Sequence, residues 1–293
     1  MGRRYETISL LTDYGLDDEF AGVVRSVIKE LAPHVTTIDL THGIRPFDVR
    51  AGSLALARAI PYVAEGVVLA VVDPGVGTSR KAIAVEVGEG AGVLVGPDNG
   101  LLAPAVALAG GATRAVELDN PAYHLEAPGA TFAGRDVFAP AAAHLCNGTD
   151  LTELGSALDA DLLVPGVIAL PRTEPDGVHA EVLWVDRFGN CQLNVGPDEL
   201  AAMAKGADEP DGDVITVLCG DERRSARLVS TFGDLAAGTV GLVLDSQGMY
   251  ALALDRRSAA AELQLGPGDA VVLRAAVDER TAVATPIDLG RRQ

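Results

Sequence analysis

The first half of the sequence alternates short apolar runs with amphipathic segments, and this alternation limits the possible folds more than any other feature. The runs with the length of buried strands are residues 8–11, 36–40, 67–72, 82–87 and 92–95. The segments with helical periodicity are residues 20–31, 49–59 and 137–145. Alternation of this kind is typical of parallel strands with helices on both faces of the sheet. The sequence therefore predicts an α/β N-terminal domain with a largely parallel central sheet.

The second half has a different pattern. Short β-rich runs, separated by Gly, Asp and Asn turns, lie at residues 179–185, 213–218, 239–244, 250–254 and 270–273. They predict a smaller all-β domain with a barrel-like or sandwich arrangement. A stretch rich in Pro and Gly precedes them and is typical of a linker. A chain of 293 residues suits two domains. We expect an α/β domain at 1–165, a linker at 166–177 and a β-rich domain at 178–293.

Charge limits the choice of partners. The chain has 41 acidic and 23 basic residues, a formal charge of −18. A surface this negative repels nucleic acid and anionic membranes, so neither is an expected partner. The charge would attract a cationic substrate, although a solvated acidic surface is its commoner meaning. No stretch reaches the roughly 18 apolar residues of a membrane helix. The N-terminal residues also lack the pattern of a signal peptide, and we expect a cytoplasmic protein.

Cysteine and histidine residues do not form a recognisable metal motif. Cys146, Cys191 and Cys219 are far apart in the sequence and lack CxxC spacing. This argues against a disulfide framework and against a zinc site. His42 and His144 have no partners at ligand spacing, so structural hydrogen bonding is the simpler interpretation. We expect no metal.

Polar clusters follow the first three predicted strands, at residues 12–19, 41–48 and 73–80. Ligands of α/β proteins bind beyond the carboxyl ends of the strands. Three such loops in succession therefore predict a binding site at that edge of the sheet.

Two of these loops also have a structural interpretation. Asp17 and Asp18 precede an amphipathic segment and suit the capping of a helix. Asp73 and Arg80 lie on one glycine-rich loop and suit a structural ion pair. These alternatives remain open at the level of sequence.

A set of spaced motifs extends over nearly the whole chain. The motifs are LTDYG at 11–15, DPGVG at 73–77 with Arg80, PDNGLL at 97–102, TFAGRDVFAP at 131–140, DRFGN at 186–190 and SQG at 246–248. In this order they resemble the S-adenosylmethionine hydroxide adenosyltransferases, which are relatives of the fluorinases and chlorinases. The resemblance implies that water attacks the ribose 5′ carbon of S-adenosylmethionine and displaces methionine. It also implies that no cofactor is needed and that the protein is a homotrimer with active sites between subunits.

The resemblance implies a catalytic set of Asp, Arg and His beside the attacking water. The Asp corresponds to Asp73 and the Arg to Arg80, while the His position holds Ala133. A carboxylate at position 73 repels halide and accepts a proton from water, which favours hydrolysis over halogenation. Ala133 is either natural divergence or an introduced substitution, and the intact residues around it favour the second. His124 is an alternative base.

The resemblance also implies the substrate contacts. Asp13 corresponds to the carboxylate that accepts hydrogen bonds from both ribose hydroxyls, which two carboxylate oxygens allow. Phe47 corresponds to an aromatic residue beside the ribose. The other implied substrate-binding residues are Asp18, Asp186 and Ser246 for the ends of methionine, Asn190, Phe188 and Phe232 for adenine, and Phe132 and Gly134 beside Ala133.

Two other functions remain possible from the sequence. Residues 12–18 imitate the acidic cluster of calcium-dependent nucleoside hydrolases, but Leu11 stands where that family has a further Asp. A binding protein for adenosine or S-adenosylmethionine without turnover is the second alternative, and Ala133 is the feature that supports it.

Overall fold

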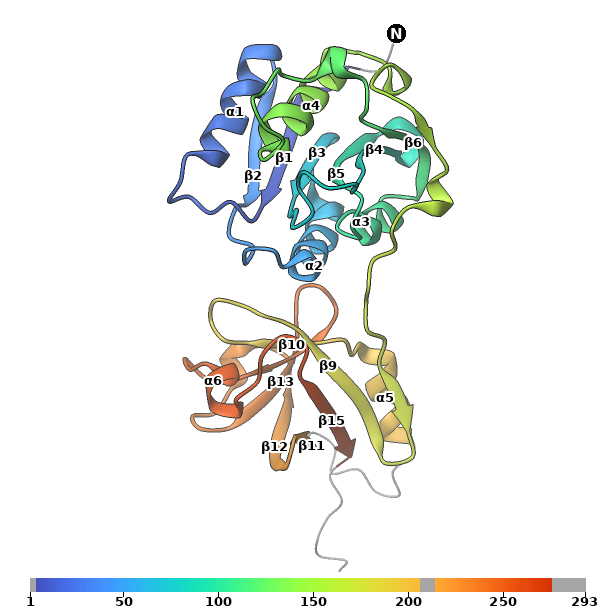
Figure 1. Ribbon diagram of the computed structural model, residues 1–293. Helices are drawn as coiled ribbons and strands as arrows, with labels where there is room; N and C mark the ends of the chain where they lie inside the picture. The colour runs from blue at the N-terminus through green and yellow to red at the C-terminus, as the bar shows by residue number, and fades with distance from the viewer. Residues whose placement is uncertain (1–3, 206–213, 276–293) are drawn as a thin grey trace, which may run out of the picture. The chain divides into compact units, whose positions relative to one another are not determined.

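Two separate sheets organise the chain, one in each of two units (Figure 1). The computed structural model describes residues 4–205 and 214–275. The α/β unit is Met1–Val167 and the β unit is Ile168–Gln293. Residues 276–293 of the predicted β-rich domain, and the predicted strand start at Asp213, lie outside the described residues.

The α/β unit is built on a seven-stranded sheet with the order β2-β1-β3-β5-β4-β6-β7. Its strands are β1 (Thr7–Thr12), β2 (Thr36–Thr41), β3 (Gly66–Val71), β4 (Ala82–Val87), β5 (Gly92–Pro97), β6 (Ala112–Glu117) and β7 (Ala157–Leu158). β2, β1, β3, β5 and β6 run in one direction, while β4 and β7 run in the other. The predicted α/β class with a largely parallel sheet is confirmed.

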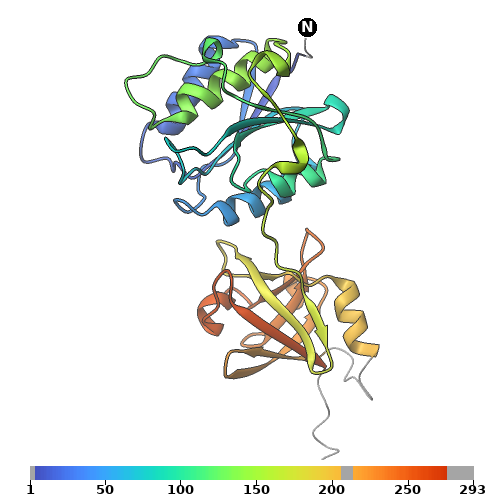
Figure 2. The same cartoon turned by 45° about the vertical axis from the view of Figure 1, so that its right-hand side comes forward.

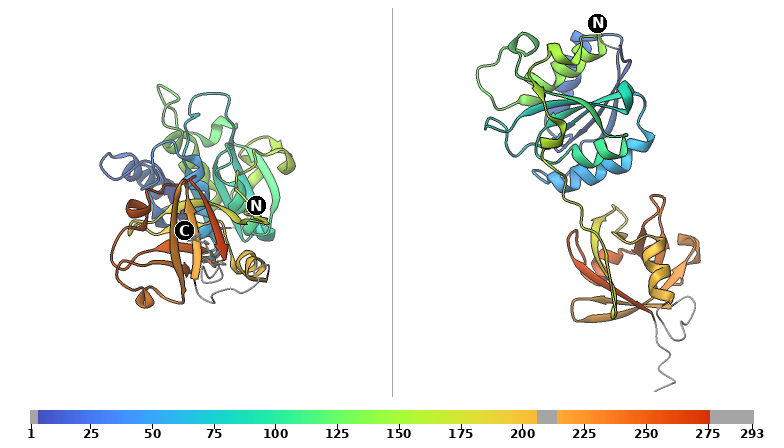
Figure 3. Two further views of the ribbon diagram at one scale, coloured as in Figure 1. Left: turned by 90° about the horizontal axis from the view of Figure 1, so that it is seen from below. Right: turned by 90° about the vertical axis from the view of Figure 1, so that its right-hand side faces the viewer.

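Helices cover both faces of this sheet (Figures 1 and 3). They are α1 (Phe20–Leu31) and α4 (Ala139–Cys146) on one face, and α2 (Val49–Ala59) and α3 (Ala103–Leu108) on the other. The helices predicted at 20–31 and 49–59 are confirmed with the same bounds. α1 buries Ala21, Val24 and Ile28, which recur at helical spacing and form its inner stripe.

Alternation along β1 separates two cores. Ile8 and Leu10 pack in the cluster with α1 and α4, whereas Leu11 packs in the cluster with α2 and α3. Successive side chains of a strand point to opposite faces, so one strand serves both cores.

Short helical turns complete the α/β unit. They are η1 (Ile60–Tyr62), η2 (Gly88–Gly90), η3 (Pro121–Tyr123), the π-helix η4 (Gly134–Phe138), η5 (Leu151–Glu153) and η6 (Ala160–Leu162). The π-helix runs directly into α4, so the helix predicted at 137–145 begins as a wider turn.

The β unit is a closed barrel. Its strands are β8 (Arg172–Glu174), β9 (Gly177–Val185), β10 (Cys191–Leu193), β11 (Val214–Cys219), β12 (Glu222–Val229), β13 (Val240–Leu244), β14 (Tyr250–Ala253) and β15 (Ala270–Ala275). They pair in the order β10-β14-β13-β12-β11-β15-β9-β8, and a further pairing of β10 with β9 closes the ring. The barrel-like prediction is confirmed, with one parallel pairing, β12 with β13. β8 falls inside the stretch expected as a linker and pairs with β9.

The described part of the β unit has three helical segments: α5 (Pro197–Lys205), η7 (Phe232–Asp234) and α6 (Ala259–Leu263). α5 lies on the outside of the barrel beside β8, β9 and β15 (Figure 2). Across residues 4–205 and 214–275, no helix combines the length and apolar character needed to cross a membrane.

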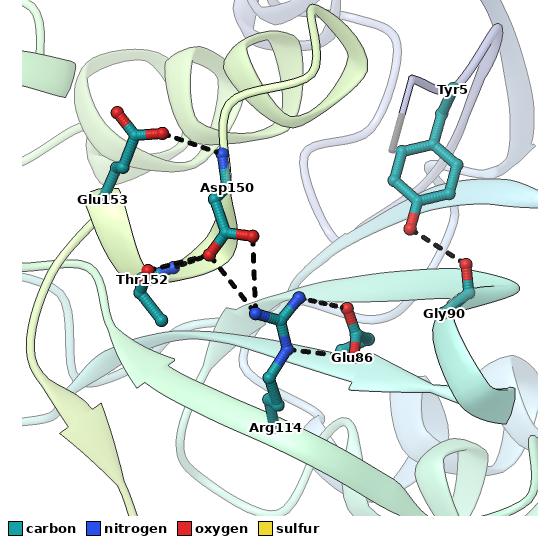
Figure 4. A network of polar contacts seen from close by, with 7 residues as sticks. All are labelled: Tyr5, Glu86, Gly90, Arg114, Asp150, Thr152 and Glu153. Carbon is teal, nitrogen blue, oxygen red and sulfur yellow. Dashed lines mark hydrogen bonds and ion pairs between the residues drawn. The ribbon is translucent and has the colours of Figure 1, made fainter. Parts of the chain in front are cut away.

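Arg114 ties the outer strands of the α/β sheet to the segment after α4 (Figure 4). Its Nη2 donates to Glu86 Oε2 on β4 over 2.6 Å, and its Nη1 donates to Asp150 Oδ1 over 3.2 Å. Asp150 in turn caps η5 in a reciprocal capping box with Glu153. We call Arg114, Glu86 and Asp150 the edge network.

Candidate active site

A cavity of about 430 Å³ lies in the α/β unit where β1, β2 and β3 end. Its wall comes from the loops after these three strands and from the segment that leads into η4. It brings together seven of the residues singled out in the sequence: Asp13, Asp18, Phe47, Asp73, Phe132, Ala133 and Gly134. The carboxyl ends of parallel strands are where an α/β fold is expected to bind its ligand.

Asp73 and Arg80 form a nearly buried ion pair at this cavity. The exposed fraction of the side chain is 5% for Asp73 and 11% for Arg80. Arg80 Nε donates to Asp73 Oδ1 over 3.0 Å, and Nη2 donates to Oδ2, so both carboxylate oxygens are held. The guanidinium also lies 5.4 Å from the centre of the Phe138 ring. Desolvation offsets much of the attraction in such a pair, so stability alone is a weak reason for its presence.

The loop that carries this pair is a tight glycine turn. Thr78 donates from its backbone N to the Gly75 carbonyl over 3.1 Å and from its hydroxyl over 2.6 Å. Gly77 has a φ of 76°, which favours glycine. A Cβ on Gly75 would lie 3.3 Å from the Arg80 Cβ, closer than is comfortable. The glycines therefore allow the turn that folds Arg80 back onto Asp73.

Asp13 is held by the neighbouring loop. Its Oδ2 accepts a hydrogen bond from the Phe47 backbone N over 2.9 Å, and Phe47 has the unusual φ of 68° for a residue with a side chain. Burial, and then the nearby Asp73 carboxylate, raise the pKa of Asp13 above its ordinary value, although the Phe47 N–H opposes this. A carboxylate has about four lone-pair sites, so the backbone contacts of Asp13 still leave acceptor capacity for ligand hydroxyls.

The buried His42 anchors this loop. Its Nδ1 lies 2.8 Å from Thr12 Oγ1, which also accepts a hydrogen bond from the Tyr14 backbone N over 3.1 Å. The backbone carbonyl of His42 accepts a hydrogen bond from the Gly15 backbone N over 2.8 Å. The structural interpretation of His42 is therefore confirmed, and its role is to fix the residues on either side of Asp13.

Helix capping does not account for Asp17 and Asp18. Glu19 is the N-cap residue of α1 and makes no side-chain capping bond. Asp48 does cap α2, because its Oδ1 accepts from the Ala51 backbone N over 2.9 Å. Asp18 is exposed and lines the cavity, so it is accessible to a ligand there.

Tyr14, Phe20 and Phe132 form an aromatic wall of the cavity. The Phe20 and Phe132 ring centres lie 5.1 Å apart, and the Tyr14 ring lies 5.9 Å from Phe20 and 5.8 Å from Phe132. Sequence reasoning missed Tyr14 and Phe20 as site residues. The position of Tyr14 directly after Asp13 was the one available signal.

Ala133 is the N-cap residue of the π-helix η4, a kind of turn that is frequent at functional sites. The alternative base His124 is engaged elsewhere. Its Nε2 lies 3.1 Å from the Leu118 carbonyl and must donate to it, because a carbonyl oxygen only accepts. His124 is also absent from the cavity wall.

A second cavity, of about 610 Å³, lies in the β unit. Phe188, Asn190 and Phe232, the three residues assigned to adenine, line it together. Phe188 and Phe232 are 75% and 52% exposed, so two aromatic faces are open to a flat ligand. The structure thus brings the predicted adenine residues together.

Asp186 and Ser246 are not part of that wall. Asp186 Oδ1 accepts from the backbone N of Phe188 and of Asn190, each over 2.9 Å, and its Oδ2 accepts from Asn190 Nδ2 over 2.8 Å. Asp186 therefore shapes the loop that presents Phe188 and Asn190. Ser246 is exposed in the turn between β13 and β14.

Comparison with known proteins connects both units to one family. The model of the SAM hydroxide adenosyltransferase N-terminal domain matches residues 8–155, and that of the C-terminal domain matches residues 180–272. The chain belongs to the SAM hydroxide adenosyltransferase family. It is 46% identical to the (R)-S-adenosyl-L-methionine hydrolase of Salinispora tropica, over 89% of this chain and 95% of that protein. It is 28% identical to a fluorinase of an Actinoplanes species, over 84% of this chain and 90% of that protein.

A solved structure has the same fold. The crystal structure of an uncharacterized conserved protein from Thermotoga maritima matches with a TM-score of 0.81 at 36% identity, and covers 91% of this chain and 99% of that one. The likeness to this structure therefore extends over most of the chain and is not confined to one unit.

The structure also bears on the nucleoside hydrolase alternative. Leu11, where that alternative needs an acidic ligand, is 1% exposed and packs in the core. Among the described residues, Glu174, Asp176 and His179 are the one group of side chains with metal-ligand spacing. Arg274 Nη2 donates to Asp176 Oδ2 over 2.8 Å, and this guanidinium already supplies the group with positive charge.

Proposed function

We propose that this enzyme hydrolyses S-adenosyl-L-methionine to adenosine and L-methionine. The observation that carries the proposal is the Asp73 carboxylate, which lines the cavity at the strand ends and is held on both oxygens by Arg80. A fixed, nearly desolvated carboxylate is suited to accept a proton from water. The hydrolase name of the 46% identical relative supports the same reaction.

The proposed chemistry is a single in-line displacement. The oxygen of one water forms a bond to the ribose 5′ carbon while the bond from that carbon to sulfur breaks. The electron pair stays on sulfur, which changes from a sulfonium to the neutral thioether of methionine. The water loses one proton to Asp73 and from there to solvent. Because the sulfonium leaves readily, the protein mainly has to position the water and the substrate.

We propose roles for the binding residues on the same basis. Asp13, which lines the cavity and has a raised pKa, is suited to accept hydrogen bonds from ribose hydroxyls. Phe47 presents a 72% exposed ring at the same cavity, and would pack against the ribose. Asp18 would attract the ammonium or sulfonium charge. Phe132 and Gly134 would shape the cavity beside Ala133.

The second cavity supports a proposed adenine site. Phe188 and Phe232 would stack on the base, and Asn190 would hydrogen-bond to its edge. Asp186 would act by holding the loop in shape, because both of its carboxylate oxygens accept hydrogen bonds from Phe188 and Asn190 of that loop. Ser246 is exposed and would meet the methionine carboxylate.

Ala133 makes slow turnover the expectation. Without an imidazole at this position, one of the three groups implied for water activation is missing. Binding without turnover is the second candidate function, and Ala133 is the residue that favours it.

We also propose that the chain assembles as a homotrimer that shares active sites between subunits and acts in the cytoplasm. The three buried free cysteines suit a reducing compartment, and the charge of −18 disfavours nucleic acid and anionic membranes. Sedimentation tests the trimer. Mixing inactive Asp73→Asn and Asn190→Ala subunits tests the sharing, because hybrids with shared sites recover part of the activity.

Product analysis in ¹⁸O-labelled water tests the reaction. The expected products are methionine and adenosine that carries one labelled oxygen on its 5′ carbon. Chloride or fluoride should yield no halogenated nucleoside. Tight binding of S-adenosylmethionine with no adenosine after prolonged incubation would support the second candidate function instead.

A further inference from the structure

The Tyr14 side chain is fixed at the cavity from several sides. Its backbone N is held by Thr12 Oγ1, and its ring contacts Phe132 edge to face and Phe20 at a tilt. The ring packs against the main core of the α/β unit and also lines the cavity. The direction of its hydroxyl is therefore set by packing.

That hydroxyl lies against the backbone of Gly134, the residue next to Ala133. A Cβ built on Gly134 would lie 2.2 Å from Tyr14 Oη and 3.1 Å from Cζ. The φ of Gly134 is not in the left-handed range, so its backbone conformation does not require glycine. The Tyr14 hydroxyl makes the closest of the contacts that exclude a side chain there, and Phe132 Cε2 follows at 3.2 Å. The phenol thus ends beside the position where the resemblance implies an imidazole.

The hydroxyl is available as a donor. Burial, and then the Asp13 and Asp73 carboxylates, raise the pKa of Tyr14 well above its ordinary value, so the phenol keeps its proton. Among the described residues, no protein group hydrogen-bonds to this hydroxyl, whereas Tyr123, away from the cavity, donates to Glu153 over 3.1 Å. The phenol of a residue that lines the cavity and stays protonated can hold a water or a ligand oxygen.

We propose that Tyr14 is a further catalytic residue, whose hydroxyl donates a hydrogen bond to the attacking water and takes the positioning role left vacant by Ala133. The proposal rests on the hydrolysis proposed above. One lone pair of the water attacks the 5′ carbon as the bond to sulfur breaks, and the other accepts the Tyr14 hydrogen bond. A water proton passes to Asp73, and Tyr14 keeps its own proton throughout.

A double-mutant cycle between positions 14 and 133 tests this role. Single-turnover adenosine release at saturating S-adenosylmethionine is compared for the unaltered protein, Tyr14→Phe, Ala133→His and the double variant. Tyr14→Phe should slow release roughly 10–100-fold, which is at or below the range typical of positioned proton-transfer groups. In the Ala133→His background, the same change should cost less than about threefold, because the imidazole then holds the water. The affinity for S-adenosylmethionine should change little in either background.

Tyr123→Phe is the matched control, since it removes a phenol hydroxyl of the same unit that does not line the cavity. A separate structural check uses Gly134→Ala, which should lower Tm in the Tyr14 protein and lower it less in Tyr14→Phe. If Gly134→Ala lowers Tm equally in the two proteins, the Tyr14 hydroxyl does not lie against Gly134 and the proposal is overturned.

The outcomes separate this proposal from the hydrolysis itself. If Ala133→His releases adenosine but Tyr14→Phe leaves the original rate unchanged, Tyr14 has no catalytic role and the proposed hydrolysis stands. If Tyr14→Phe slows adenosine release equally with Ala and with His at position 133, Tyr14 does not take the role of the missing imidazole, and the proposal is overturned. If no protein of the set releases adenosine, both proposals fail.

Discussion

Two arginines of the α/β unit are held by carboxylates in similar ways but in different surroundings. Arg80 engages Asp73 at the cavity, where the two side chains are 11% and 5% exposed. Arg114 engages Glu86 and Asp150 in the edge network, where the three side chains are 42%, 14% and 27% exposed. The edge network links β4, β6 and the segment before η5, whereas Asp73 and Arg80 lie on one loop.

We propose that the buried pair orients a carboxylate for function and that the edge network serves the fold. Asp73 and Arg80 are seven residues apart, so their contact joins no distant segments of the chain. Burial of the pair also carries a desolvation cost, and the pair therefore contributes little net stability. It does orient a carboxylate at a cavity. The edge network joins segments that are distant in sequence, but solvent weakens each contact. Breaking the buried pair is nevertheless costly, because it leaves the Asp73 carboxylate buried without a partner. We therefore expect damage at Arg80 to affect both folding and activity, and damage at Arg114 to affect stability slightly and activity not at all.

The largest expected effect comes from restoring the missing group beside the buried pair. Ala133→His should raise single-turnover adenosine release about 10²–10⁴-fold, the usual contribution of a positioned proton-transfer group. Substrate affinity should change little, because the proposed binding contacts lie elsewhere. Asp73→Asn in the restored protein should reverse most of the gain. An unchanged rate in Ala133→His would mean either that the assigned water position is wrong or that Tyr14 already supplies the whole contribution of the imidazole.

Arg80→Met and Arg114→Met test the comparison directly. Arg80→Met leaves the Asp73 carboxylate nearly buried without its partner, and should lower the free energy of unfolding by about 3–5 kcal/mol. Adenosine release should also be lost. Arg114→Met should cost about 1 kcal/mol or less and leave release unchanged. Urea unfolding measures the stability of the two variants, and the product assay measures their adenosine release. Equal stability losses in Arg80→Met and Arg114→Met would contradict the difference between the buried pair and the edge network.

Asp13→Asn tests a carboxylate of the same cavity that forms no ion pair with an arginine among the described residues. The amide oxygen still accepts from Phe47, but one charged acceptor is lost, so binding of S-adenosylmethionine should weaken by roughly 2–4 kcal/mol in calorimetry. The pKa of Asp13 is raised in the folded protein, so stability is lost as pH rises through the unfolded and then the folded pKa. The ligand-free variant should therefore be at least as stable as the parent at neutral pH. A clear loss of Tm without ligand would assign Asp13 a structural role.

The sequence predicted those elements whose burial repeats with a regular period. α1 has its predicted bounds because Ala21, Val24 and Ile28 recur at helical spacing. β12, with the sequence ERRSARLV, was not predicted, since of its residues only Ala226 is fully buried. α5 was also missed: its nine residues are a short amphipathic segment in a region dominated by strands.

The candidate site divides in the same way. Asp13 and Asp73 follow strands directly, so the topology of a parallel sheet places them at one edge and the sequence predicts their proximity. The closeness of Tyr14 Oη to Gly134 depends on how α1 and η4 pack against each other, and no local pattern encodes it. The engagement of His124 by the Leu118 carbonyl likewise needed the tertiary structure.

The smallest expected effect is a pH dependence of the edge network. The Thr152 backbone N–H and hydroxyl, and then Arg114, hold the pKa of Asp150 below its ordinary value. A lowered folded pKa contributes stability above the unfolded pKa, near 3.9, and that stability is lost as pH falls through the folded pKa. The stability difference between the parent and Arg114→Met should therefore be largest near neutral pH and should shrink on acidification below about pH 4. Urea unfolding at a series of pH values measures it. A difference that stays constant into strong acid would mean that Arg114 acts through packing of its aliphatic stem, and not through its charge.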